Sequence, residues 1–78
     1  MWNNGTIWTE NKAGYDYWVK HYEEGSRFGI DEGRISKLEI RRHGENKTLV
    51  NYDRGWDVNV PDDKQINEVY AVLLAKYN

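Results

Sequence analysis

Only one stretch of this chain carries the spacing of an amphipathic helix, and it follows the rest of the sequence. Apolar residues recur there at intervals of three and four, at Ile66, Val69, Tyr70, Leu73, Leu74 and Tyr77, which is the pattern of one apolar helical face. Pro61 ends the preceding region, and Asp62 with Gln65 matches a capping box. We therefore expect one helix that starts after Asp62 and can cover only one side of whatever precedes it.

The sequence before Pro61 has the composition and alternation of β-strands. The expected strands are residues 5–10, 15–23, 34–42 and 48–52. Residues 56–60 either continue the last strand past a bulge at Asp53–Gly55 or depart from it, because glycine within a strand pattern often marks a bulge. The predicted fold is α+β: a four-stranded antiparallel meander with one C-terminal helix packed on one face, in the order β-β-β-β-α.

Chain length limits how this fold can be stabilised. The 78 residues form a single domain, residues 1–78, and contain no cysteine, so disulfides cannot support a core this small. Four Trp, six Tyr and one Phe supply large apolar side chains instead. The start of the chain has no basic segment followed by an apolar run, and no stretch of about 20 apolar residues occurs. We expect a cytoplasmic protein with no membrane span.

Charge is mixed along the chain. Eleven basic and thirteen acidic side chains give a net charge of −2, and the two signs alternate. A general nucleic-acid binder would carry a basic excess on at least one element. Only Arg41-Arg42-His43, with Lys47 nearby, hints at such a cluster, and a solvated hairpin turn explains it more simply. The composition therefore disfavours nucleic-acid binding.

Aromatic residues occupy both faces of the strand predicted for residues 15–23. Tyr15 and Tyr17 alternate with Trp18 and Tyr22. Because one helix covers one face of a sheet, at least one of Trp8, Trp18 and Tyr22 is expected to remain on the uncovered face. Interface cores are enriched in Trp, Tyr and Arg, so these rings would be available to a partner or to a second copy.

No set of residues matches a catalytic or metal motif. Neither Ser26 nor Ser36 lies in a nucleophile elbow. Asp53 and Asp57 could share a metal or a proton, but the commoner outcome for this spacing is one turn cap and one ion pair. We expect no enzymatic activity, no cofactor and no metal.

Arg54 lies between Tyr52 and Trp56 and admits two interpretations. In the structural one, which we favour, its guanidinium stacks on an indole and forms a fork to a carboxylate, which is Asp53, Asp57 or an acid in the long loop. In the functional one, Arg54 converges with Arg27 and Arg34 on an anionic ligand. The glycines of the long loop from Gly25 to Gly33 would let backbone amides approach a phosphate, although no P-loop or dinucleotide motif is present.

Two inner segments, Gly25–Leu38 and Tyr52–Asp57, together with the closing Leu74–Asn78, resemble a family of small uncharacterised domains. That family occurs in Gram-positive gut bacteria and in their phages and prophages. The resemblance covers most of the chain and implies no catalytic residues. It implies a mobile-element setting, in which small cytoplasmic proteins act by binding a host defence enzyme, a signalling nucleotide or a nuclease.

The sequence thus predicts a non-enzymatic protein-binding module, with a phage-encoded inhibitor of a bacterial defence factor as its specific form. The alternative is an oligomeric binder that sequesters an anionic nucleotide signal. The partner would be a host protein or a nucleotide-type ligand, and a homo-oligomer fits the second alternative. The predicted contact residues are Trp18, Tyr22, Arg27, Phe28, Arg34, Arg54 and Trp56.

Overall fold

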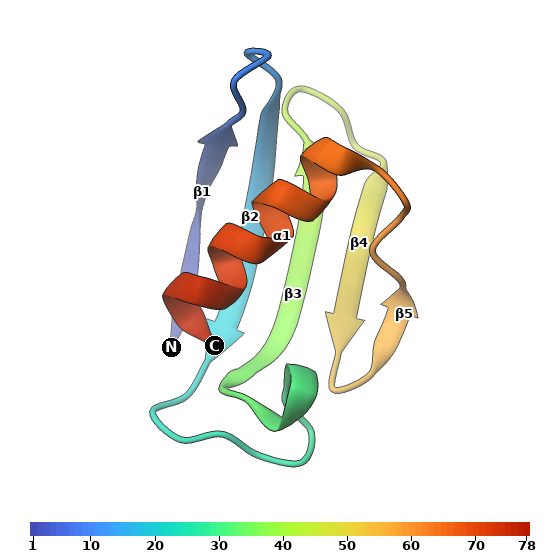
Figure 1. Cartoon of the computed structure of the whole chain (residues 1–78). Helices are drawn as coiled ribbons and strands as arrows, with labels where there is room; N and C mark the ends of the chain where they lie inside the picture. The colour runs from blue at the N-terminus through green and yellow to red at the C-terminus, as the bar shows by residue number, and fades with distance from the viewer.

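The strand patterns fold into one antiparallel sheet, and the apolar stripe folds into one helix that lies across it (Figure 1). The computed structural model describes residues 1–78. Its elements are β1 (Trp2–Trp8), β2 (Gly14–His21), the 3-10 turn η1 (Ile30–Glu32), β3 (Ile35–Arg42), β4 (Thr48–Asp53), β5 (Trp56–Val58) and α1 (Lys64–Tyr77). Each strand pairs with the next one in sequence, so the order across the sheet is β1-β2-β3-β4-β5. The α+β class and the antiparallel meander with one C-terminal helix are as predicted.

The sheet has five strands, and the prediction of four is wrong. The chain reverses at Arg54 and Gly55, and β5 then pairs back along β4, with Trp56 opposite Tyr52. The Asp53 amide donates to the Gly55 carbonyl at 2.9 Å, and Arg54 adopts a left-handed conformation with φ of 55°. Glycine at position 55 therefore belongs to a tight turn and does not mark a bulge in a continuing strand.

The core lies between α1 and the sheet face that it covers (Figure 1). Alternate residues of the three central strands point into it, and Val19, Ile40 and Val50 are fully buried. Leu73 of α1, also fully buried, belongs to the same core cluster. Tyr15 and Tyr17, which the alternation placed on one face of their strand, are buried on this side, because burying a ring against the helix removes a large apolar area from water.

The helix carries the predicted stripe but begins one residue later than predicted. Asp63, not Asp62, is the N-cap, and its Oδ1 accepts from the Ile66 amide at 3.0 Å. Gln65 does not complete a capping box, because its Oε1 accepts from the Tyr15 hydroxyl at 3.2 Å. The Gln65 side chain thus joins the helix to the sheet, and Asp63 alone caps the first turn through the Ile66 amide.

The long loop between β2 and β3 is held to the end of the helix by Asn78. The Asn78 Oδ1 accepts from the Ile35 amide at 2.9 Å, and Nδ2 donates to the Ile30 carbonyl at 3.1 Å. Gly33 makes room for this contact, since a Cβ there would lie 2.3 Å from the amide of Asn78. Ile30 itself is buried in the core, so both a polar clamp and an apolar anchor fix the loop.

We expect Asn78→Ala to lower the free energy of unfolding by about 1–3 kcal/mol, because it leaves the buried amide of Ile35 without an acceptor. Asn78→Asp keeps the acceptor but loses the donor to Ile30, so its loss should be smaller. Urea denaturation of the two variants and the parent chain measures both effects. Equal stability of Asn78→Ala and the parent would contradict this role of the clamp.

Candidate functional site

The sheet face opposite α1 carries exposed tryptophans. The alternating residues of β1 place Trp2 and Trp8 there, with 57% and 61% of their surfaces exposed, and β2 contributes Trp18 at 36%. Tyr22, just beyond β2, is half exposed. The prediction that at least one of Trp8, Trp18 and Tyr22 remains on the uncovered face is confirmed. Its physical cause is that the chain has no second helix to cover this side.

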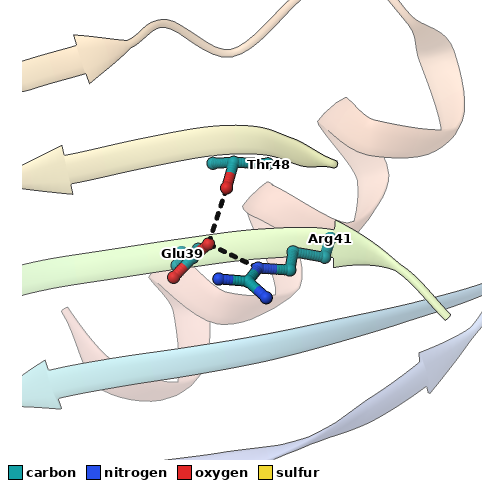
Figure 2. Close-up of polar contacts among 3 residues, drawn as sticks. All are labelled: Glu39, Arg41 and Thr48. Carbon is teal, nitrogen blue, oxygen red and sulfur yellow. Dashed lines mark hydrogen bonds and ion pairs between the residues drawn. The ribbon is translucent and has the colours of Figure 1, made fainter. Parts of the chain in front are cut away.

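Two carboxylates on this face are already engaged by neighbouring side chains. Figure 2 shows Glu39 accepting from Arg41 Nε at 2.6 Å and from the Thr48 hydroxyl at 2.8 Å. The Arg41 guanidinium also lies over the Trp18 ring, 5.3 Å from its centroid. Burial opposes ionisation of Glu39, but the hydrogen bonds from Arg41 and Thr48 outweigh it, so its pKa lies below the ordinary value. Glu39 and Arg41 thus form an ion pair that holds the Arg41 guanidinium over the indole of Trp18.

Asp16 is engaged in the same way on the neighbouring strand. It accepts from the Thr6 hydroxyl at 2.6 Å and pairs with His43 Nδ1 at 2.8 Å. The hydrogen bond from Thr6, followed by that from His43, lowers the pKa of Asp16. Both carboxylates of this part of the face, Asp16 and Glu39, thus accept hydrogen bonds from neighbouring side chains.

A groove opens where the ends of β2, β3 and β4 meet the long loop. It has a volume of about 370 Å³, within the usual range of small-ligand sites. Three cations, two rings and two hydroxyl groups line it: Lys20, Lys37, Arg54, Tyr22, Phe28, Ser26 and Ser36. No carboxylate lines the groove, so its local charge is positive although the chain as a whole is acidic.

The cations of the groove are largely free of ion pairs. Lys37 pairs with Asp53 at 3.7 Å, a distance near the limit for such a contact, and neither Lys20 nor Arg54 has a carboxylate within 4.0 Å. The nearby Lys20 ammonium lowers the pKa of the Tyr22 hydroxyl. This corner of the molecule therefore presents positive charge and aromatic surface to solvent together.

The favoured interpretation of Arg54 is wrong. The structure has no ion pair from Arg54 to Asp53, to Asp57 or to an acid of the long loop, and the guanidinium does not stack on Trp56. The turn at Arg54 directs its side chain to the groove. Trp56 lies on the helix side instead, with its ring 5.0 Å from that of Tyr52 and also edge-on to an α1 tyrosine.

The structure brings some of the predicted contact residues together and separates others. Tyr22, Phe28 and Arg54 line the groove, and the Arg27 guanidinium lies 5.1 Å from the centroid of the Phe28 ring beside it. Trp18 lines an adjoining hollow that shares Lys37 with the groove.

Arg34 lies outside the groove and lines a separate hollow with His21 and Glu23. Its Nε donates to the Asn78 carbonyl at 3.3 Å. The predicted convergence of three arginines on one ligand is therefore wrong, because the loop turns Arg34 toward the end of α1.

Lys20 and Lys37 are the site residues that the sequence did not single out. Alternation along each strand did place both on the outward face, Lys20 with Trp18 and Tyr22, and Lys37 with Glu39. The sequence did not indicate the position of the long loop, which brings Phe28 into the lining of the same groove as these two lysines.

The glycine-rich loop does not form a phosphate cradle. Its amides bind within the loop: the Ser26 amide donates to the Gly33 carbonyl at 3.1 Å and the Gly29 amide to the Ser26 carbonyl at 3.0 Å. A Cβ on Gly29 would lie 2.0 Å from the Gly33 carbonyl oxygen. The glycines therefore allow the backbone to pack tightly, and an anion in the groove would be bound by side chains.

Metal-ligating side chains are dispersed. The structure contains no group of three His, Cys, Asp or Glu residues that could hold a metal ion. His21 contacts Asn3 at 2.7 Å, and His43 pairs with Asp16 on another part of the sheet.

The helix α1 falls short of the length and hydrophobicity that crossing a bilayer requires.

The architecture and the exposed surface define a small α+β domain with one covered and one uncovered sheet face. The chain belongs to the family described as "Domain of unknown function (DUF7678)", whose model matches residues 1–78. This match confirms the broader part of the resemblance, membership of a family of small uncharacterised domains. Searches of the curated proteins and of the solved structures found no match to the chain.

The ion pair between Glu39 and Arg41 predicts a pH dependence of the free energy of unfolding. Its pKa is lower in the folded state, so its stabilising contribution is present above the unfolded value of about 4.3 and is lost as the pH falls through the folded value. We expect Glu39→Gln to lower the free energy of unfolding at pH 7 by about 0.5–1 kcal/mol. The difference from the parent chain should be smaller at pH ~3 than at pH 7, because a larger share of Glu39 is then protonated and neutral, as Gln is.

Urea denaturation at the two pH values measures this change, with Glu45→Gln in the exposed β3–β4 connection as the matched control. A Glu39→Gln effect of the same size at both pH values would show that ionisation of Glu39 does not contribute.

Proposed function

We propose that the protein is a non-enzymatic protein-binding module that contacts its partner through the uncovered sheet face and the adjoining groove. The observation that carries this proposal is the presence of Lys20 and Arg54, without carboxylate partners, beside the exposed rings of Tyr22 and Phe28. Trp18 extends the aromatic surface along the same face.

The energetics favour an acidic partner surface. Each large ring can bury about 150–250 Å² in an interface, and binding hot spots are enriched in Trp, Tyr and Arg. The nearby Asp16 and Glu39 are already hydrogen-bonded, so they do not neutralise the groove. Carboxylates on a partner would supply what Arg54 and Lys20 lack, and a guanidinium can bind a carboxylate through two parallel hydrogen bonds.

The resemblance to domains of phages and prophages sets the biological context of the proposal. In that context the partner is a bacterial defence factor, the location is the host cytoplasm, and binding inhibits the factor. The absence of cysteine fits a reducing compartment.

We expect Trp18→Ala and Arg54→Ala each to weaken partner binding about thirtyfold, since truncating a hot-spot residue costs about 2 kcal/mol. A partner recovered from a lysate of a Gram-positive gut bacterium would be purified, and its dissociation constant measured for each variant by calorimetry. Lys64→Ala removes a positive charge from α1, on the other side of the sheet, and should bind as the parent does. Parent-like binding by both site variants would reject this surface.

A second function, binding of an anionic nucleotide-type ligand, is favoured by the shape and chemistry of the groove itself. Its volume suits a small ligand, Tyr22 and Phe28 offer rings on which a base can stack, and three cations can bind phosphates. In this form the protein would sequester a nucleotide signal as a homo-oligomer.

This alternative predicts a thermal shift with a member of a nucleotide panel. A ligand at a hundredfold excess over its dissociation constant stabilises the fold by about 2.7 kcal/mol. Arg54→Ala and Lys20→Ala should abolish the shift, whereas Arg34→Ala, which changes a separate hollow, should retain it. The absence of any shift across the panel would eliminate this function and leave the protein-binding proposal unaffected.

A further inference from the structure

The outer edge of β1 is a long unpaired strand edge. β1 has seven residues and ends the strand order on one side, whereas β5, at the other side, has three. Figure 1 shows no other element beside the outer edge of β1. The free N–H and C=O groups of such an edge are a template for a further strand.

β1 lacks the features that usually prevent edge pairing. These features are a short strand, a charged residue, a proline or a bulge. The sequence of β1, WNNGTIW, contains no charged residue and no proline, and it pairs with β2 in unbroken register from Trp2–Lys20 to Trp8–Gly14. The opposite edge is protected, because β5 is short and carries Asp57.

The hydrogen bonds to β2 identify which backbone groups of β1 are free. Met1 and His21 exchange two backbone bonds at 2.9 Å, and the Thr9 amide donates to the Ala13 carbonyl at 2.9 Å. Bonded and non-bonded positions alternate along an antiparallel strand. The even-numbered residues of β1 therefore direct their N–H and C=O groups outward: Trp2, Asn4, Thr6 and Trp8.

These outward groups are complementary to themselves. If two copies of β1 lie antiparallel with Gly5 opposite Gly5, then Trp2 lies opposite Trp8 and Asn4 opposite Thr6, all at positions with outward backbone groups. Registers centred on Asn4 or Thr6 have the same parity, but each leaves one tryptophan of each copy without an opposite residue of β1. The Gly5-centred register is thus the one that pairs the full strand.

The side chains fit this register. Trp2 and Trp8, both more than half exposed, would form an aromatic cross-strand pair at each end of the interface, and such pairs contribute about 0.2–1 kcal/mol each. On the helix side, Val72 of α1 is 49% exposed and lines a hollow with Ile7 and Trp8 at this same edge. It would extend the apolar contact beyond the strands.

We propose that two copies of this chain pair through β1 to form a two-fold symmetric dimer with one continuous sheet. The interface is isologous, with the symmetry axis at Gly5 perpendicular to the sheet. Both uncovered faces then lie on the same side, and each copy keeps its own groove. The dimer does not depend on the partner or ligand proposed above, because it uses a different edge of the molecule.

Sedimentation velocity over a range of concentrations tests the dimer. The parent chain should sediment as a dimer, and Asn4→Pro should sediment as a monomer with an unchanged circular dichroism spectrum, because the Asn4 amide points outward and does not bond to β2. Asn4→Lys, which adds a charge to the edge without restricting the backbone, should give the same result if the proline variant fails to fold. Asn46→Pro, in the exposed β3–β4 connection, is the matched control and should remain dimeric. A monomeric parent, or a dimer that survives both Asn4 variants, would overturn the proposal.

Cysteine cross-linking tests the register, because the chain has no cysteine of its own. Paired residues at hydrogen-bonded positions have Cα atoms about 5.5 Å apart, within the range that a disulfide spans. Under oxidation, a mixture of Asn4→Cys and Thr6→Cys chains should form the cross-linked dimer, and neither variant should form it alone. Cross-linking of Asn4→Cys alone or of Thr6→Cys alone would place the axis elsewhere, and no cross-linking in any combination would reject β1 pairing.

Discussion

The structure depends on the packing of one helix against one face of a five-stranded sheet. Val19, Ile40 and Val50 lose all contact with water because Leu73 and its neighbours on α1 cover them. That burial supplies most of the available hydrophobic stabilisation in a chain of this size. It also leaves the other face of the same strands in water, and the exposure of Trp2, Trp8, Trp18 and Lys20 follows from this asymmetry.

Charge is distributed unevenly over the uncovered face. Toward the end of the sheet away from the long loop, carboxylates are hydrogen-bonded to neighbouring side chains, as Glu39 is to Arg41 and Thr48. Near the long loop the same strands present Lys20, which has no ion pair, and Lys37, whose ion pair with Asp53 is 3.7 Å long. A net charge of −2 conceals this separation, because it sums contributions from surfaces that a ligand or partner would meet separately.

Local pattern predicted the elements, whereas the site depends on contacts between distant segments. Alternation in residues 34–42 and the helical stripe at Ile66–Tyr77 identified β3 and α1 because both periods are regular. β5 escaped prediction because three residues with a central Asp57 carry too little alternation, and because Gly55 resembles a bulge as much as a turn. The groove could not be predicted, since the position of Phe28 depends on the fold of the long loop, which the buried Ile30 and the contacts of Asn78 hold in place.

Arg54 adopts a backbone conformation that suits glycine better than arginine. Its φ of 55° lies in the left-handed region, where a side chain costs about 1 kcal/mol or more relative to glycine. The neighbouring residue of the same turn is already a glycine, Gly55. At position 54 the backbone conformation therefore favours glycine, whereas the positive charge of the groove depends in part on arginine. Selection for thermal robustness alone would drive this residue toward glycine, so retention of a guanidinium here in natural variants would indicate that the cation confers a benefit beyond folding.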